Sequence, residues 1–162
     1  MRGNFPVKEG YVPFAGYQTW YRVVGDAEAP GKLPLLCLHG GPGGTWHHME
    51  PYTDLAEGRR VICYDQLGCG NSAVNEPHDA SMLKDFDITA DLGRIAVPTL
   101  LFCGEFDEVT PATQAQAGAG IRGSELVVMP GCSHMSQAEQ PAATLGLVRG
   151  WLAGVEASRS AG

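Results

Sequence analysis

The chain has 162 residues and a formal net charge of −7, from 18 acidic and 11 basic side chains. Its hydrophobic fraction of 44% and charged fraction of 18% are typical of a folded globular protein and exclude a disordered one. The acidic balance and the lack of a Lys/Arg cluster argue against nucleic acid or an anionic membrane as a partner. The N-terminus has no apolar signal segment and no run approaches about 18 apolar residues, so we expect a cytoplasmic protein.

Strands and helices are predicted to alternate along the chain. The first two strands alternate apolar and polar residues around Gly16, which is typical of an antiparallel hairpin, whereas the later ones are continuous apolar runs, typical of strands buried on both faces. The predicted strands cover residues 11–15, 17–24, 33–38, 60–64, 97–103 and 125–129. Helices are predicted over residues 46–57, from Pro111 to residues 118–120, and from about Pro141 onwards. This order favours an α/β fold: a mainly parallel sheet of about six strands, with an N-terminal antiparallel hairpin and flanking helices.

A glycine-rich turn follows the predicted strand at residues 33–38. Residues 39–44 read His-Gly-Gly-Pro-Gly-Gly, a sequence that leaves backbone N–H groups free of side-chain cover. Uncovered N–H groups are what the stabilisation of a transient oxyanion requires. The turn is therefore a candidate site for binding developing negative charge.

Two further segments carry recognisable motifs. Residues 64–72 read Tyr-Asp-Gln-Leu-Gly-Cys-Gly-Asn-Ser, and residues 85–152 contain two short apolar strands that end at Asp107 and just before His134. Together with the 39–44 turn, these segments resemble the proline iminopeptidases, serine peptidases of the α/β-hydrolase superfamily. The resemblance implies a truncated α/β-hydrolase core forming a single domain over residues 1–162. It also implies hydrolysis of peptide, amide or ester bonds, with release of N-terminal proline in the family.

The resemblance also implies which residues act. The triad of α/β-hydrolases runs in the order nucleophile, acid, histidine, and Asp107 and His134 match the acid and the histidine. The backbone N–H of Gly41, or of its neighbour Gly40, would supply one donor of the oxyanion hole. The alternative interpretation is that Asp107 caps the following helix and that His134 is an ordinary turn residue.

No residue of the chain fits the nucleophile, which stays unknown. Family members carry a Gly-x-Ser-x-Gly elbow, its strand and a helical cap between the matching segments, and residues 73–86 form a junction in their place. Ser81 lacks the flanking glycines that the strained elbow needs, and Ser72 matches a position that is not nucleophilic in the family. Cys69 and Ser133 lack the surroundings that activate a substitute nucleophile. We therefore expect the chain to be inactive or nearly so.

The five cysteines and five histidines predict neither a metal site nor a disulfide, because their spacing fits neither. Cys37, Cys63 and Cys103 lie within predicted strands, where a free thiol behaves as a small buried apolar group. Free thiols agree with a reducing compartment. We expect no metal and no cofactor.

Two other functional interpretations stay open at this point. The chain is either a non-catalytic binding or interaction protein on a hydrolase scaffold, or a truncated product without independent function. By resemblance, its expected substrate is a small peptide, amide or ester. Loss of the family's central strand would expose apolar strand edges, which either close up within one chain or pair two copies as a homodimer.

Overall fold

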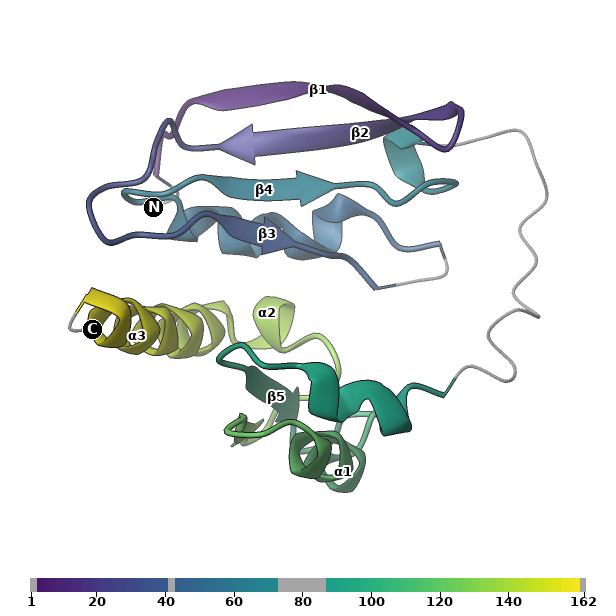
Figure 1. The fold of residues 1–162 in the computed structure, drawn as a ribbon, viewed down its shortest axis with the longest axis vertical. Helices are drawn as coiled ribbons and strands as arrows, with labels where there is room; N and C mark the ends of the chain where they lie inside the picture. The colour runs from purple at the N-terminus through teal and green to yellow at the C-terminus, as the bar shows by residue number, and fades with distance from the viewer. Residues whose placement is uncertain (1–2, 41–42, 73–86, 161–162) are drawn as a thin grey trace. The chain divides into compact units, whose positions relative to one another are not determined.

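The computed structural model describes residues 3–40, 43–72 and 87–160. The chain divides into two compact units, Met1–Ser81 with Glu156–Gly162 and Met82–Val155 (Figure 1). The predicted junction at residues 73–86 lies outside the described residues. No helix in the described ranges is long and apolar enough to cross a membrane.

The first unit contains a four-stranded sheet in the order β1-β2-β4-β3. Its strands are β1 (Val7–Phe14), β2 (Tyr17–Val24), β3 (Leu35–Cys37) and β4 (Val61–Tyr64). β2 pairs antiparallel with both β1 and β4, and β3 pairs parallel with β4. One face of this sheet packs on the helical segment η1 (Trp46–Leu55), where the rings of Trp20 and Trp46 lie 5.6 Å apart. That face carries the buried side chains of Val61 and Cys63 and forms the core of the unit.

The β1–β2 hairpin is closed by a two-residue turn, because Phe14 pairs directly with Tyr17. Both turn residues have a left-handed backbone, with φ of 50° at Ala15 and 83° at Gly16. Two consecutive positive φ angles define the type I′ turn, whose twist matches that of the flanking strands. The predicted hairpin is thus confirmed, with β1 longer than expected.

The predicted helix at residues 46–57 forms a 3₁₀ helix rather than an α-helix. Pro51 lies in the middle of η1, where its ring has no N–H to donate and would clash with an α-helical carbonyl four residues earlier. Within η1 the Thr53 hydroxyl donates to the Glu50 carbonyl at 2.7 Å. The segment keeps its predicted place, and proline changes its hydrogen bonding.

The second unit contains a two-stranded parallel sheet, β5 (Leu100–Gly104) and β6 (Glu125–Met129). The α-helix α1 (Pro111–Gly120) connects the two strands, and the Thr110 hydroxyl caps its first turn by accepting from the Thr113 N–H. The short segments η4 (Thr89–Arg94) and α2 (Ser136–Glu139) belong to the same unit. α3 (Pro141–Ser160) begins in this unit, and its residues from Glu156 on belong to the first.

The predicted α/β class is confirmed, and the expected strands are present in sheets of four and two. The expectation that the later strands are buried on both faces was wrong. Leu36 on β3 is 56% exposed, and Leu126 and Val128 on β6 are 37% and 39% exposed. Within the described residues, each sheet therefore buries one face and leaves part of the other open.

Candidate functional site

The acid and the histidine expected from the sequence lie together in the second unit. Asp107 follows β5 and His134 follows β6, and since these strands are parallel neighbours both residues come to the same end of the sheet. His134 Nδ1 lies 2.9 Å from Asp107 Oδ1. The same carboxylate oxygen accepts a hydrogen bond from the Val109 N–H at 2.8 Å. The backbone two residues after Asp107 thus holds its carboxylate, which in turn orients the imidazole of His134.

The two side chains differ in exposure, and this sets what each can do. The Asp107 side chain is 7% exposed, whereas that of His134 is 53% exposed. Because Nδ1 is engaged by Asp107, Nε2 is the nitrogen left to exchange a proton, with the nearest Glu108 oxygen 3.9 Å away. An imidazole oriented through Nδ1 and open at Nε2 has the geometry of a general base.

The pair shifts both pKa values in the directions expected for an ion pair. The hydrogen bond to Asp107 raises the pKa of His134 above its usual value, against the opposing effect of burial. Burial by itself would raise the pKa of Asp107, but the hydrogen bonds from His134 and the Val109 N–H outweigh it and lower that pKa. The carboxylate therefore stabilises the imidazolium form of His134.

A third acidic residue, Glu139, holds the backbone around His134. Its Oε2 accepts from the Ser133 N–H at 2.8 Å, and its Oε1 accepts from the Ser133 hydroxyl at 2.6 Å and from the Met135 N–H at 3.1 Å. These hydrogen bonds from Ser133, above all from its hydroxyl, lower the pKa of Glu139. Sequence reasoning missed this residue, although Glu139 is the one acidic side chain between residues 131 and 140.

Two more contacts fasten the His134 loop to the end of β5. The Phe106 N–H donates to the Cys132 carbonyl at 2.9 Å, and the Gly131 N–H donates to Glu105 Oε2 at 3.0 Å. A side chain at Gly104 would place its Cβ 2.2 Å from the Ser133 carbonyl oxygen, so the close approach needs glycine. The loop is therefore fixed on both sides of His134.

The glycine-rich turn of the first unit is held by its own histidine. His39 is 3% exposed, and its Nε2 accepts the Gln66 N–H at 2.9 Å, so the proton sits on Nδ1 and is donated to the Gly40 carbonyl at 2.7 Å. The Gln66 amide Nε2 donates back to the His39 carbonyl at 2.7 Å. Gly44 must lack a side chain, because a Cβ there would lie 2.1 Å from the Gly40 carbonyl oxygen.

The oxyanion-hole prediction falls partly outside the described residues. Gly41, the first candidate donor, lies there, while Gly40 is described and exposed. The N–H of Gly40 has no partner within residues 3–40, 43–72 and 87–160. Gly40 therefore remains a predicted donor in the first unit, and Asp107 and His134 form a pair in the second.

Ser72 has a structural place in the first unit. Its hydroxyl accepts the Trp20 N–H at 2.8 Å and donates to the Asp65 carbonyl at 2.8 Å, and the side chain is 2% exposed. The Asp65 carboxylate, which is fully buried, accepts from the Trp46 N–H and from the backbone and side chain of Asn71. A hydroxyl shared between two backbone groups of the core is a poor nucleophile, which agrees with the sequence interpretation of Ser72.

The other residues considered as nucleophiles are Ser133, Cys69 and Ser81, and the structure does not support any of them in that role. The Ser133 hydroxyl donates to Glu139, and no hydrogen bond joins Cys69 to a histidine side chain within the described part of the chain. Ser81 lies outside the described residues. The described cysteines are free thiols, and no group of three or more potential metal ligands occurs among the residues that the structure describes.

Comparisons with known proteins show what the chain is similar to. A family model described as the alpha/beta hydrolase fold matches residues 34–90. A proline iminopeptidase from Lactiplantibacillus plantarum is 37% identical over 145 residues, which are 86% of this chain and 46% of that protein. One from Clostridioides difficile is 55% identical over 69 residues, which are 42% of this chain and 23% of that protein. These sequence matches support an α/β-hydrolase of proline iminopeptidase type.

A solved structure agrees with this family at the level of the fold. The crystal structure of the proline iminopeptidase from Mycobacterium smegmatis is similar with a TM-score of 0.82 and 17% identity, over 94% of this chain and 100% of that chain. At that identity the likeness shows the fold alone. The chain spans less than half the length of the two sequence relatives, at 46% and 23%.

Proposed function

We propose that the chain carries the acid–base part of a proline iminopeptidase-type hydrolase. The observation that supports this most directly is the 2.9 Å contact between His134 Nδ1 and Asp107 Oδ1 at the ends of adjacent parallel strands. In this role His134 takes the proton of an attacking hydroxyl through Nε2, and Asp107 stabilises the imidazolium that results. The substrate class is a small peptide, amide or ester, with N-terminal proline suggested by the names of the relatives.

We further propose that this chain alone does not complete acyl transfer. Its 162 residues contain no Gly-x-Ser-x-Gly segment, and the described serines and Cys69 lack the hydrogen bond to His134 that would activate them. A hydrolase of this type without its nucleophile keeps at most about 10³–10⁴-fold of catalysis over water. In this proposal the chain has the acid and the histidine of the triad but lacks its nucleophile.

A fluorophosphonate probe tests this proposal on the folded chain, read out by intact mass. We expect no stoichiometric adduct and no turnover of proline 4-nitroanilide, under conditions where an active proline iminopeptidase shows both. A stoichiometric adduct on wild-type protein that disappears in His134→Ala would overturn the proposed lack of a nucleophile. It would also name that residue by peptide mapping.

We also propose that the chain works in the cytoplasm. Free, buried thiols such as Cys37 and Cys63 support a reducing compartment.

We further propose that the chain pairs with a second copy. β3 ends the sheet order β1-β2-β4-β3, and Leu36 and Leu38 beside its edge are more than half exposed, which favours strand pairing between copies. Sedimentation at increasing concentration should show a dimer that Leu36→Lys weakens, and a monomer at all concentrations would contradict the pairing.

A further inference from the structure

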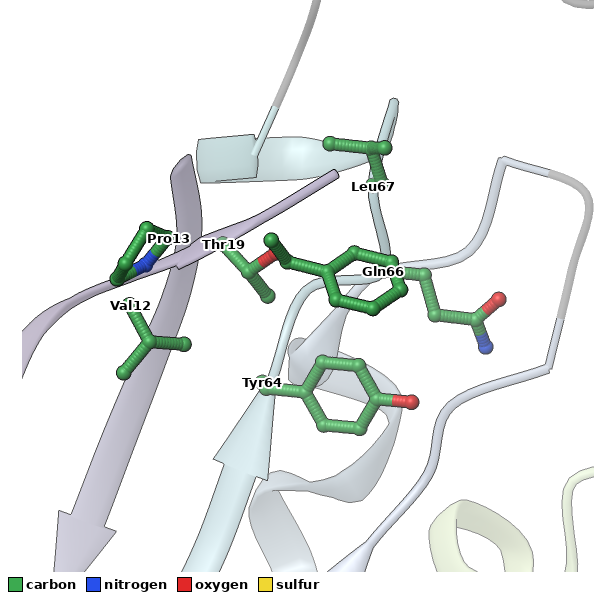
Figure 2. A pocket seen from close by; sticks show the side chains of 7 residues that line it. Val12, Pro13, Thr19, Tyr64, Gln66 and Leu67 are labelled. Carbon is green, nitrogen blue, oxygen red and sulfur yellow. The ribbon is translucent and has the colours of Figure 1, made fainter. Parts of the chain in front are cut away.

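The first unit contains a cavity of about 500 Å³, and neither Asp107 nor His134 lines it. It is formed by β1, β2 and the segment that follows β4 (Figure 2). Most of its wall is apolar. The lining residues are Val12, Pro13, Phe14, Thr19, Tyr64, Gln66 and Leu67. Its volume is within the range of small-molecule sites in proteins.

The cavity lies on the sheet face opposite the one that packs on η1. Val12 and Thr19 are direct partners across β1 and β2, and Tyr21, two residues after Thr19, is the partner of Tyr64 on β4. Side chains that are partners or two residues apart share a face of the sheet. Thr19 and Tyr64 therefore share one face, whereas Trp20 and Cys63 lie on the other, in the core.

The Thr19 hydroxyl is the unusual feature of this cavity. Thr19 is 9% exposed, and its Oγ1 has no hydrogen-bond partner within the described residues. Buried hydroxyls are nearly always hydrogen-bonded, because an unpartnered one gives up its contacts with water without compensation. Because Thr19 also lines the apolar cavity, a ligand bound there can supply the acceptor that this hydroxyl lacks.

The remaining polar groups of the wall narrow the class of ligand. Figure 2 shows Tyr64 and Gln66 on the side of the cavity away from Val12 and Pro13. One N–H of the Gln66 amide donates to the His39 carbonyl, which leaves its second N–H and its Oε1 as neutral polar groups beside the cavity. None of the lining side chains is charged. A charged ligand would find no partner to offset its desolvation there.

We propose that this cavity binds a small, neutral, mostly apolar carbonyl compound whose oxygen accepts the hydrogen bond of Thr19. The carbonyl supplies the acceptor that the buried hydroxyl lacks, and the apolar remainder of the ligand covers Val12, Phe14 and Leu67. The inference concerns the first unit only and does not depend on the proposed hydrolase function. It would hold equally for a chain that only binds its ligand.

The test uses acetophenone as the probe and ethylbenzene, which lacks the carbonyl, as its matched comparison. Amide resonances of the folded, isotopically labelled chain are followed by NMR as each probe is added. We expect saturable shifts confined to residues 12–14, 19 and 64–67, with acetophenone bound more tightly than ethylbenzene. Shifts elsewhere, or none that saturate, would overturn the proposed site.

Two threonine variants separate the hydrogen bond from general apolar binding. Thr19→Val keeps the shape of the side chain and should weaken acetophenone binding by about 3- to 10-fold, the worth of one hydrogen bond, while leaving ethylbenzene unaffected. Thr53→Val serves as the control, because the Thr53 hydroxyl already donates to Glu50 and lies outside the cavity.

Stability without ligand provides an independent readout. Thr19→Val should melt at the same temperature as wild type or higher, because it replaces an unpartnered buried hydroxyl by a methyl group. If Thr19→Val binds acetophenone as wild type does, or if it melts at a clearly lower temperature, the hydroxyl is already satisfied and the proposal fails.

Discussion

His134 and Asp107 are brought within 2.9 Å of each other by two parallel strands that end side by side. Neither residue is held by this contact alone. Asp107 also accepts the Val109 N–H, and the backbone on both sides of His134 is bound by Glu139. The pair is thus built into two fastened loops, which is the condition for an imidazole to act as an oriented base.

Glu139 should keep the His134 loop ordered. Glu139→Gln retains one acceptor oxygen but removes the charge, so we expect the Ser133 and Met135 amides to exchange with solvent several-fold faster. Hydrogen exchange measured by NMR checks this, with Glu57→Gln, an exposed residue of the first unit, as the control. Unchanged exchange at both amides in Glu139→Gln would show that the loop does not depend on this carboxylate.

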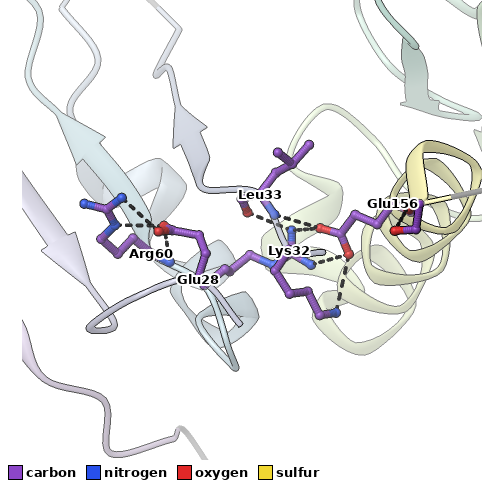
Figure 3. A network of polar contacts seen from close by, with 7 residues as sticks. Glu28, Lys32, Leu33, Arg60 and Glu156 are labelled. Carbon is purple, nitrogen blue, oxygen red and sulfur yellow. Dashed lines mark hydrogen bonds and ion pairs between the residues drawn. The ribbon is translucent and has the colours of Figure 1, made fainter. Parts of the chain in front are cut away.

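Arg59 and Glu156 form a buried ion pair in the first unit (Figure 3). Their contacts are 2.6 Å between Nη1 and Oε1 and 3.0 Å between Nη2 and Oε2, and both side chains are less than a tenth exposed. Arg59 also donates to the Leu33 carbonyl, and the Leu33 N–H donates to Glu156. Removing one partner, as in Glu156→Ala, should lower the free energy of unfolding by about 3–5 kcal/mol because Arg59 is left buried and unpaired.

A double variant distinguishes the buried charge from lost packing. Arg59→Met with Glu156→Leu replaces both charges by apolar groups, so urea denaturation should show a smaller loss than Glu156→Ala alone. Glu28 and Arg60 provide the exposed control pair, whose removal we expect to change stability little. A double variant as unstable as the sum of its single changes would contradict this account.

The same pair predicts how stability depends on pH. Burial would raise the pKa of Glu156, but the hydrogen bonds from Arg59 and Leu33 lower it. A lowered folded-state pKa means that the contribution of Glu156 is present above about pH 4.3, the unfolded value for glutamate, and is lost as pH falls through the folded value. Urea midpoints measured from pH 6 downwards should therefore fall less steeply in the double variant than in wild type.

Ala15 should be a site where stability can be gained. It has a φ of 50° in the β1–β2 turn, a conformation that L-residues other than Asn, Asp and Gly adopt at a cost. Ala15→Asn or Ala15→Gly should raise the free energy of unfolding by about 0.5–1 kcal/mol. Thermal melts of these variants test this against Ala27→Gly, which lies outside the turn. A lower melting temperature for both turn variants would contradict the strain assigned to Ala15.

The sequence predicts those parts of the fold that local patterns determine. Alternation around Gly16 marks the hairpin, the apolar run at residues 125–129 coincides with β6, and Pro111 marks the start of α1. Proline also explains two differences, because Pro34 delays β3 until Leu35 and Pro51 turns the predicted helix into a 3₁₀ helix. Burial on both faces could not be inferred, since it depends on which elements cover a sheet and not on the strand itself.

Only some residues of the candidate site could be predicted from the sequence. Asp107 and His134 follow from the resemblance and from their positions at strand ends, and the structure brings them into contact. Glu139 and the His39–Gln66 contact could not be predicted, because each depends on the path of a loop between residues that carry no motif of their own. The unpartnered Thr19 hydroxyl is a property of the folded sheet, and no sequence pattern indicates it.

The titration of His134 tests the acid–base pair most directly. Since Asp107 raises the pKa of His134, the stabilisation from that group is complete below about pH 6.5, the unfolded value, and is lost as pH rises through the folded value. We would follow the imidazole resonances of His134 by NMR in wild type, in Asp107→Asn and in the control Asp91→Asn. We expect a His134 pKa above the usual value in wild type and in Asp91→Asn, and a clearly lower one in Asp107→Asn. If His134 titrates identically in all three proteins, Asp107 does not act on the imidazole and the proposed pair is wrong.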